Sequence, residues 1–477
     1  MRQLNRETVP SQELPIKILQ FGEGNFLRAF VDWMVDIMNK EHNYNSGVAI
    51  VQPIEFGMTD MLRKQDNLYH HIYRGLKDGK AISETRLISC VQKAINPFEQ
   101  KKEYEDLAIL NELELVISNT TEAGIVFKAD DCPKEGELAT TYPGKLTQLL
   151  LSRFTHFNGD TAKGLKFIPV ELIDKNGEKL KKAILDYAKL WSLSEEFTQW
   201  VDNCNYFANT LVDRIVPGYP KDEIDEIKKS IGFDDNLVVS SEIFHLWVIE
   251  GCEEIQKAFP ADKCGLNVIY TKDLSPYRTR KVRILNGAHT SMVPVALLNG
   301  IETVRESVES KNVGEFVRHI IFNEIAPTIN LPKAELELYA TEVLERFMNP
   351  YIHHELKSIA LNSISKYKVR VLPSLLDSLK TNNKLPKGLV LAFTYLIKLY
   401  LSESFTIQDS DEVIAFFSTL SSETETETET PEAIIRKVLG EVSFWDTDLN
   451  QINGLTEMIT SQLELLNKDV AIGNFKL

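Results

Sequence analysis

The chain has 477 residues, of which 43% are hydrophobic and 26% charged, a composition typical of a globular protein. Its formal net charge of −16 argues against nucleic acid or an anionic membrane as the main partner. The length exceeds what one ordinary hydrophobic core requires, so we expect two domains.

The 5 cysteines are scattered and include no Cys-x-x-Cys pair, which is typical of neither a disulfide framework nor a zinc site. The first residues lack the apolar run of a signal peptide. No stretch approaches the ~18 unbroken apolar residues of a membrane span. We therefore expect a cytoplasmic protein with reduced thiols.

A glycine turn follows the first predicted strand. Residues 15–21 form a short strand pattern that runs into Gly22-Glu23-Gly24-Asn25-Phe26, after which apolar residues recur at helical spacing. Such a turn binds dinucleotides because glycines permit close backbone approach and the helix N-terminus faces the pyrophosphate. Leu27 stands where the usual Gly-x-Gly-x-x-Gly pattern has its third glycine, so a plain strand-to-helix turn is an alternative.

The next predicted strand covers residues 47–54. Its end often carries an acidic residue that holds the adenine ribose of NAD. Gln52-Pro53 occupies that place here, and Glu55 is the nearest acid. The choice between NAD and NADP therefore stays open.

Further β patterns continue this half of the chain. Two runs within residues 69–90 predict a hairpin inserted into the sheet. Residues 114–118 predict a buried strand that ends in a polar loop, Asn119-Thr120-Thr121, at the edge where such sheets bind cofactors; a plain capped loop is the alternative. A strand over 165–172 and a helix over 178–191 follow.

Residues 275–290 predict a helix with a chemically mixed face, which Ser275-Pro276 begins. On an α-helix advancing about 100° per residue, Lys281, Asn286 and His289 fall within an arc of roughly 140°. Such side chains suit a carbonyl substrate, because lysine exchanges a proton, the amide donates a hydrogen bond and histidine holds a hydroxyl. A solvated polar face is the alternative interpretation.

After Pro276 the patterns become helical, over residues 313–325, 334–347 and 389–400. We therefore expect an α/β Rossmann-type domain over residues 1–275, with the hairpin insertion, and a largely α-helical domain over 276–477. The Glu-Thr repeat at 423–430 predicts a solvated acidic loop.

Three segments together resemble the polyol-specific long-chain dehydrogenases, also called the mannitol dehydrogenase family. They are residues 22–30, residues 209–215 (Asn-Thr-Leu-Val-Asp-Arg-Ile) and Lys281-x-Arg283-x-Leu285-Asn286-x-x-His289. Their correct order over most of the chain makes coincidence improbable. The resemblance implies a Rossmann-type N-terminal domain, an α-helical C-terminal domain and metal-independent hydride transfer with a nicotinamide cofactor, usually NAD.

The resemblance also assigns roles to residues. The catalytic lysine maps onto Lys281, the asparagines that bind the substrate oxygen onto Asn209 and Asn286, and the substrate-binding histidine onto His289. Taken alone, Asn209 is equally explained as a capping residue. The expected cofactor contacts are Phe21, Gly22, Gly24, Asn25, Phe26, Arg28, Asn119, Thr120 and Thr121.

Within the family, residues 20–33, 118–125 and 285–290 most resemble the members that interconvert D-tagaturonate and D-altronate in hexuronate catabolism. A uronate carboxylate on this acidic protein requires a local cation. Lys366, Lys368 and Arg370 are the candidates, and an ordinary basic surface turn is the alternative for each.

We therefore expect an NAD-dependent oxidoreductase that acts on a small sugar acid by metal-independent hydride transfer. The alternatives are fructuronate reduction, a neutral polyol dehydrogenase acting on mannitol or arabinitol, and, from another class, a non-catalytic dinucleotide sensor. The oligomeric state stays open.

Overall fold

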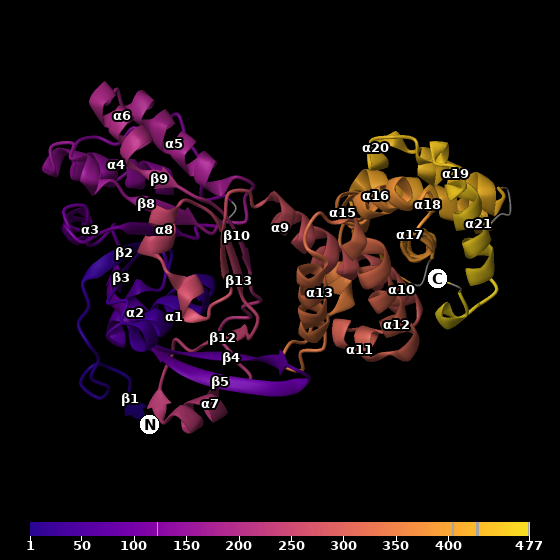
Figure 1. Cartoon of the computed structure of the whole chain (residues 1–477), viewed down its shortest axis with the longest axis horizontal. Coiled ribbons are helices and arrows are strands. Elements are labelled where there is room, and N and C mark those ends of the chain that lie inside the picture. Colours follow the sequence, from indigo (N-terminus) through magenta and orange to yellow (C-terminus); the bar gives the residue numbers. More distant parts are fainter. Residues whose placement is uncertain (122, 403–404, 426–428, 476) are drawn as a thin grey trace. The chain divides into compact units, whose positions relative to one another are not determined.

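The computed structural model describes the chain except residues 122, 403–404, 426–428 and 476, and it divides into two compact units (Figure 1). The first unit comprises Met1–Arg74 and Ile82–Leu274, and the second comprises Gly75–Ala81 and Ser275–Leu477. Among the described residues, no helix is both long and apolar enough to cross a lipid bilayer.

The first unit is built on a six-stranded parallel sheet with the strand order β6-β3-β2-β7-β8-β9. The chain winds outward from β2 to β6, then returns to place β7 on the other side of β2. This is the doubly wound Rossmann arrangement, whose crevice lies at the carboxyl ends of the central strands. The predicted fold class is therefore confirmed. The strands are β2 (Ile16–Phe21), β3 (Gly47–Val51), β6 (Val91–Ile95), β7 (Leu115–Ser118), β8 (Lys166–Pro169) and β9 (Tyr206–Phe207).

Apolar side chains on both faces of these strands explain why helices cover the sheet on two sides (Figure 1). Ile18 of β2 packs in the core that α1 shares, whereas its neighbour Leu19 packs in the core that α4 shares. The helices of the first unit are α1 (Asn25–His42), α2 (Thr59–Lys64), α3 (Lys101–Leu107), α4 (Tyr142–His156), α5 (Asn176–Leu190), α6 (Glu195–Cys204), α7 (Ile224–Ile231) and α8 (Glu253–Ala258).

The predicted hairpin is present as β4 (Tyr69–Lys77) and β5 (Lys80–Ile88). The prediction that it is inserted into the main sheet was wrong. The hairpin instead forms a separate sheet in which β12 (Val239–Glu242) pairs in parallel with β4. This partner lies far along the sequence, where local patterns give no information about pairing. The other small sheets are β1 (Arg2–Gln3) with β11 (Phe233–Asp234), and β10 (Asn209–Asp213) with β13 (Leu246–Glu250) and β14 (Val268–Thr271).

The second unit is largely helical, and within Ser275–Leu477 the described residues contain no strand beyond an isolated bridge. The buried helix α17 lies at its centre and packs against α10 and α21. The tip of the β4–β5 hairpin belongs to this unit, where the Gly79 N–H donates to Glu345 Oε1 of α13 at 3.1 Å. The α-helices are α9 (Ser275–Arg280), α10 (Gly287–Leu298), α11 (Val304–Glu309), α12 (Lys311–His319), α13 (Lys333–Phe347), α14 (Leu356–Ile359), α15 (Ser363–Arg370), α16 (Leu372–Asn382), α17 (Lys387–Tyr400), α18 (Asp411–Glu425), α19 (Pro431–Gly440), α20 (Val442–Trp445) and α21 (Leu455–Leu466).

The Glu-Thr repeat is only partly a loop. Helix α18 runs into it as far as Glu425, so the expectation of a loop over all of 423–430 was wrong for its first part. Nothing in alternating Glu and Thr breaks a helix before Pro431. Residues 426–428 of the repeat lie outside the described residues, and the Thr430 side chain caps α19 by accepting from the Ala433 N–H at 3.2 Å.

Candidate active site

The first predicted glycine closes the turn between strand β2 and helix α1. Gly22 has a φ of +119°, which side chains disfavour, and its N–H donates to the Val51 carbonyl of β3 at 3.0 Å. A Cβ at this position would lie 2.9 Å from the Asn119 carbonyl oxygen after β7. Gly22 is therefore required where the ends of three central strands meet.

The second predicted glycine leaves the start of α1 open. Gly24 is the N-cap residue, no side chain caps the helix, and its first turn contains no acidic residue. A Cβ built on Gly24 would meet nothing within 4 Å. Backbone N–H groups at the start of an 18-residue helix, beside open space, fit the pyrophosphate of a dinucleotide.

Arg28 holds this turn from beneath and is only 1% exposed. Its Nε donates to the Glu23 carbonyl at 3.1 Å, Nη1 to the Leu237 carbonyl at 2.6 Å and Nη2 to Asn25 Oδ1 at 2.7 Å. Burial lowers the pKa of the guanidinium. This geometry makes Arg28 and Asn25 residues that position the turn.

The two predicted aromatic residues support the same turn. Phe21 is fully buried and packs against the Tyr142 ring at 4.8 Å, and Phe26 stacks on Phe30 at 5.0 Å.

The loop after β7 is held by an acid that the sequence patterns did not single out. Glu171 Oε1 accepts the N–H and the hydroxyl of Thr120, each at 3.0 Å, and Oε2 accepts the Ser118 hydroxyl at 3.0 Å. Burial raises the pKa of this carboxyl. Thr120 is therefore turned toward Glu171, whereas Thr121 is exposed with a φ of +71°. An acidic residue at the carboxyl end of a buried strand was the available signal.

Asn209, at the start of β10, has a fully engaged amide in this structure. Its Nδ2 donates to Glu250 Oε2 at 2.7 Å and to Glu178 Oε1 at 3.0 Å, and its Oδ1 accepts the Glu178 N–H at 3.2 Å. The bond from Asn209 lowers the pKa of the Glu178 carboxyl. Sequence patterns gave no sign of the two glutamates, because they join Asn209 from other elements.

The predicted lysine and one asparagine lie on a π-helix, Lys281–Asn286, between α9 and α10. The assumption of a regular α-helix through these residues was therefore wrong. In a π-helix the hydrogen bonds run between residues five apart, so Lys281 and Asn286 stand one turn apart on the same face. The Asn286 side chain makes no hydrogen bond within the described part of the chain.

Two ion pairs and a ring contact fix this segment. Arg280 pairs with Glu335 at 2.5 Å, and Arg283 pairs with Asp377 at 2.7 Å. His289, on α10, stacks on the Phe347 ring at 4.3 Å. These contacts fix the segment that carries Lys281 to helices α13 and α16 of the second unit.

The three candidate cations on α15 have different surroundings. Lys366 Nζ donates to the Ile359 carbonyl at 2.8 Å, and Lys368 pairs with Asp446 at 2.6 Å. The Arg370 guanidinium makes no ion pair or hydrogen bond with any residue that the structure describes, and burial lowers its pKa. Its backbone carbonyl lies 2.9 Å from the position of a Cβ on Gly287, directly after the π-helix.

Sequence profiles of known families match both halves of the chain. The profile described as the mannitol dehydrogenase Rossmann domain matches residues 16–262, and that of the mannitol dehydrogenase C-terminal domain matches residues 273–467. The chain belongs to the mannitol dehydrogenase family. The resemblance carried by its three sequence segments is thereby confirmed, and the chain is an oxidoreductase.

Relatives of similar length include three proteins named altronate oxidoreductase. The proteins from Phocaeicola vulgatus and Bacteroides thetaiotaomicron are 46% and 45% identical, with 98% of each chain covered. The protein from Bacillus subtilis is 45% identical over 98% of this chain and 96% of its own.

Two solved dehydrogenase structures share the fold. A substrate-free D-sorbitol dehydrogenase has a TM-score of 0.79 at 19% identity and covers 99% of both chains. Pseudomonas fluorescens mannitol 2-dehydrogenase, in a ternary complex with NAD and D-mannitol, has a TM-score of 0.64 at 19% identity, over 98% of this chain and 97% of that one.

Proposed function

We propose that the chain interconverts D-tagaturonate and D-altronate with NAD. The observation that carries this proposal is the 45–46% identity to proteins named altronate oxidoreductase over 98% of the chain. The side chains of the lysine segment and the unengaged Arg370 suit a substrate that carries both a carbonyl and a carboxylate.

The first unit offers a place for the cofactor. Gly22 and Gly24 allow a close approach to the start of α1, whose N–H groups would hold the pyrophosphate. The nicotinamide cofactor supplies hydride to the keto carbon in reduction and accepts it in oxidation. Arg28 and Glu171 keep the two binding loops in place.

The second unit offers the proton chemistry. As the keto group is reduced, negative charge develops on its oxygen; Lys281 donates a proton there, and the Asn286 amide donates a hydrogen bond. In oxidation a neutral Lys281 accepts the hydroxyl proton. His289, held against Phe347, orients a substrate oxygen.

Asn209 needs a rearrangement before it can assist. Both of its amide hydrogens point to carboxylates, so a substrate oxygen gains a bond only if one of them leaves. Glu178 is the more mobile choice because its side chain is 57% exposed. We assign Asn209 to substrate binding on that condition.

The test compares Lys281→Ala with Lys333→Ala, a control at a lysine whose side chain is 87% exposed. Loss of the proton donor lowers kcat by about 10²–10⁴-fold, while NADH binding, measured by fluorescence titration, stays unchanged. Lys333→Ala keeps wild-type turnover. Unchanged turnover in Lys281→Ala would remove this mechanism.

The substrate is tested by NADH consumption with tagaturonate, fructuronate and fructose in parallel. We expect turnover with tagaturonate alone. A preference for fructose would keep the mechanism and overturn the carboxylate site, and NADH binding without turnover of any sugar would favour a dinucleotide sensor.

A further inference from the structure

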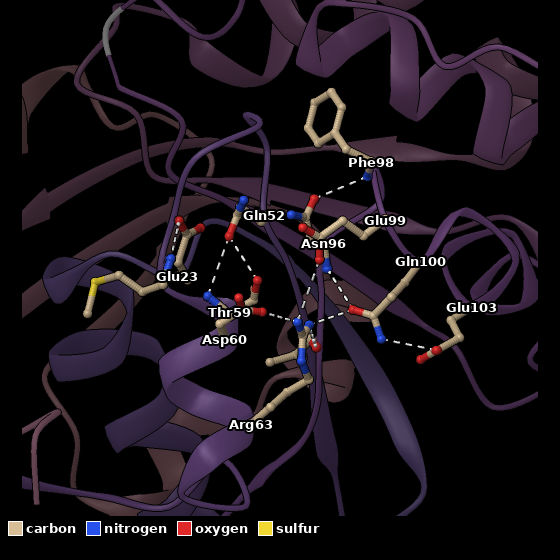
Figure 2. Close-up of polar contacts among 12 residues, drawn as sticks. Glu23, Gln52, Thr59, Asp60, Arg63, Asn96, Phe98, Glu99, Gln100 and Glu103 are labelled. Carbon is tan, nitrogen blue, oxygen red and sulfur yellow. Dashed lines mark hydrogen bonds and ion pairs between the residues drawn. The ribbon is translucent and has the colours of Figure 1, made fainter.

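The residue at the end of β3 cannot hold a ribose in this chain. Gln52 is 2% exposed and folds back into its own loop (Figure 2). Its Nε2 donates to the carbonyl oxygens of Ile54 and Glu55, each at 2.9 Å, and its Oε1 accepts the Thr59 hydroxyl at 2.8 Å. The amide therefore shapes the loop over residues 53–58 and is unavailable to a ligand.

A carboxylate from the neighbouring turn reaches this loop instead. Glu23 lies between the two glycines of the turn, and its Oε1 accepts the Met58 N–H at 3.4 Å. Figure 2 draws a dashed line at the Glu23 carboxylate for this contact. A Cβ on Gly57 would lie 2.1 Å from Glu23 Oε1 and 2.5 Å from Gln52 Cδ, so the loop passes closely over Glu23. Among the residues that the structure describes, only the backbone N–H groups of Met58 and of Glu23 itself donate to this carboxylate.

The cations near this loop are already engaged. Arg63 Nη1 donates to the Ala94 carbonyl at 3.1 Å, and its Nη2 pairs with Asp60 (Figure 2). Arg28 bonds carbonyl and amide oxygens beneath the turn. A 2′-phosphate would thus face the Glu23 carboxylate with both of these arginines already engaged.

The loop also exposes large apolar side chains. Ile54 is 62% exposed and Phe56 is 81% exposed, at the carboxyl edge of the sheet. Apolar surface beside a hydrogen-bond acceptor is suited to a nucleoside, whose flat base and ribose hydroxyls need both.

We propose that Glu23 accepts hydrogen bonds from the adenosine ribose of the cofactor and selects NAD over NADP. A carboxylate accepts bonds from a free 2′-hydroxyl and repels a phosphate at that position. In such sheets an acidic residue at the end of the second strand usually holds the ribose. Here Glu23 of the glycine turn supplies that carboxylate. This inference rests on the proposed function, because it requires a nicotinamide dinucleotide at the start of α1.

The test measures the Kd values of NADH and NADPH by fluorescence titration, without turnover. We expect the wild type to bind NADH at least about tenfold more tightly than NADPH, and Glu23→Gln to reduce that ratio by about tenfold. Glu112→Gln, a control at an exposed acid just before β7 and so at the opposite, amino edge of the sheet, leaves the ratio unchanged. Glu23→Asp, which keeps the charge, retains a preference for NADH.

Equal binding of NADH and NADPH by the wild type would overturn the inference, and this measurement needs no variant. An unchanged ratio in a Glu23→Gln protein with wild-type thermal unfolding would also overturn it. If NADH binds and tagaturonate is reduced in either case, the proposed function survives. If the wild type binds neither nucleotide, both proposals fail.

Discussion

Lys366, Lys368 and Arg370 stand two residues apart on one short helix, and of the three only the Arg370 side chain makes no ion pair or hydrogen bond with the described residues. The first two already have an oxygen partner each. Burial has already removed part of the water around the Arg370 guanidinium. It therefore loses fewer water contacts when a carboxylate binds than a fully solvated guanidinium would, and it gains more from the new ion pair.

We therefore predict that Arg370→Ala raises KM for tagaturonate by about 10–100-fold, as expected when a charged hydrogen bond worth about 1.5–3 kcal/mol is lost. Activity toward fructose, which has no carboxylate, changes little. Lys368→Ala is the control. Equal losses with both sugars would show that Arg370 supports the fold and does not read the carboxylate.

For single residues, the sequence reduced the candidates for the carboxylate-binding cation to three but did not distinguish among them. Sequence position brought three cations to one helix, but their partners, Ile359 and Asp446, come from other elements. The same limit applies to Asn209, whose two glutamates are 31 and 41 residues away.

Among the elements, the turn into α1 contains two glycines that are required for different reasons. Gly22 has a left-handed φ and a carbonyl oxygen against its missing Cβ, so the fold itself needs it. Gly24 has a φ of −66° and open space around it, so the fold does not.

Gly24→Ala should accordingly leave the free energy of unfolding within about 1 kcal/mol of the wild type. The added methyl group enters the space that a pyrophosphate needs, so the Kd for NADH should rise by at least about tenfold. Urea denaturation and fluorescence titration measure the two quantities.

The contrasting variant is Gly22→Ala, which should lose about 1–3 kcal/mol of stability through backbone strain and the contact with Asn119. Wild-type NADH affinity in Gly24→Ala would show that the cofactor does not lie against this turn.

Elements were predictable where one period runs uninterrupted. The patterns over 15–21, 114–118 and 334–347 correspond to β2, β7 and α13. The π-helices were not predictable, because widening a helix by one residue leaves the apolar pattern nearly unchanged. Residues 313–325, expected as a single helix, divide into α12 and a π-helix, Ile320–Ile325.

For the whole molecule, the buried Asp32 and the partly buried His245 of the first unit couple stability to pH in opposite directions. Burial raises the pKa of Asp32 to about 7 and lowers that of His245 to about 3. The stability from protonated Asp32 is present at low pH and is lost as pH rises from about 4 through 7. The stability from neutral His245 is present above about pH 6.5 and is lost as pH falls toward 3.

Asp32→Asn should therefore gain stability relative to the wild type as pH rises from 5 to 8, because the amide needs no proton to stay neutral. Urea denaturation across this range measures the difference. Asp222→Asn, at an exposed acid, is the control and should show no such trend. A difference independent of pH would mean that Asp32 is not protonated in the folded protein.

The tip of hairpin β4–β5, residues 75–81, belongs to the helical unit although it is synthesised early. Gly79 and its partner Glu345 are 266 positions apart. During synthesis the tip is made long before α13, so this contact cannot form until residue 345 has been added. Closing so long a loop costs entropy before any contact compensates for it, and this favours slow, late assembly of that unit. Dividing the gene at codon 275 would split one folding unit between two polypeptides.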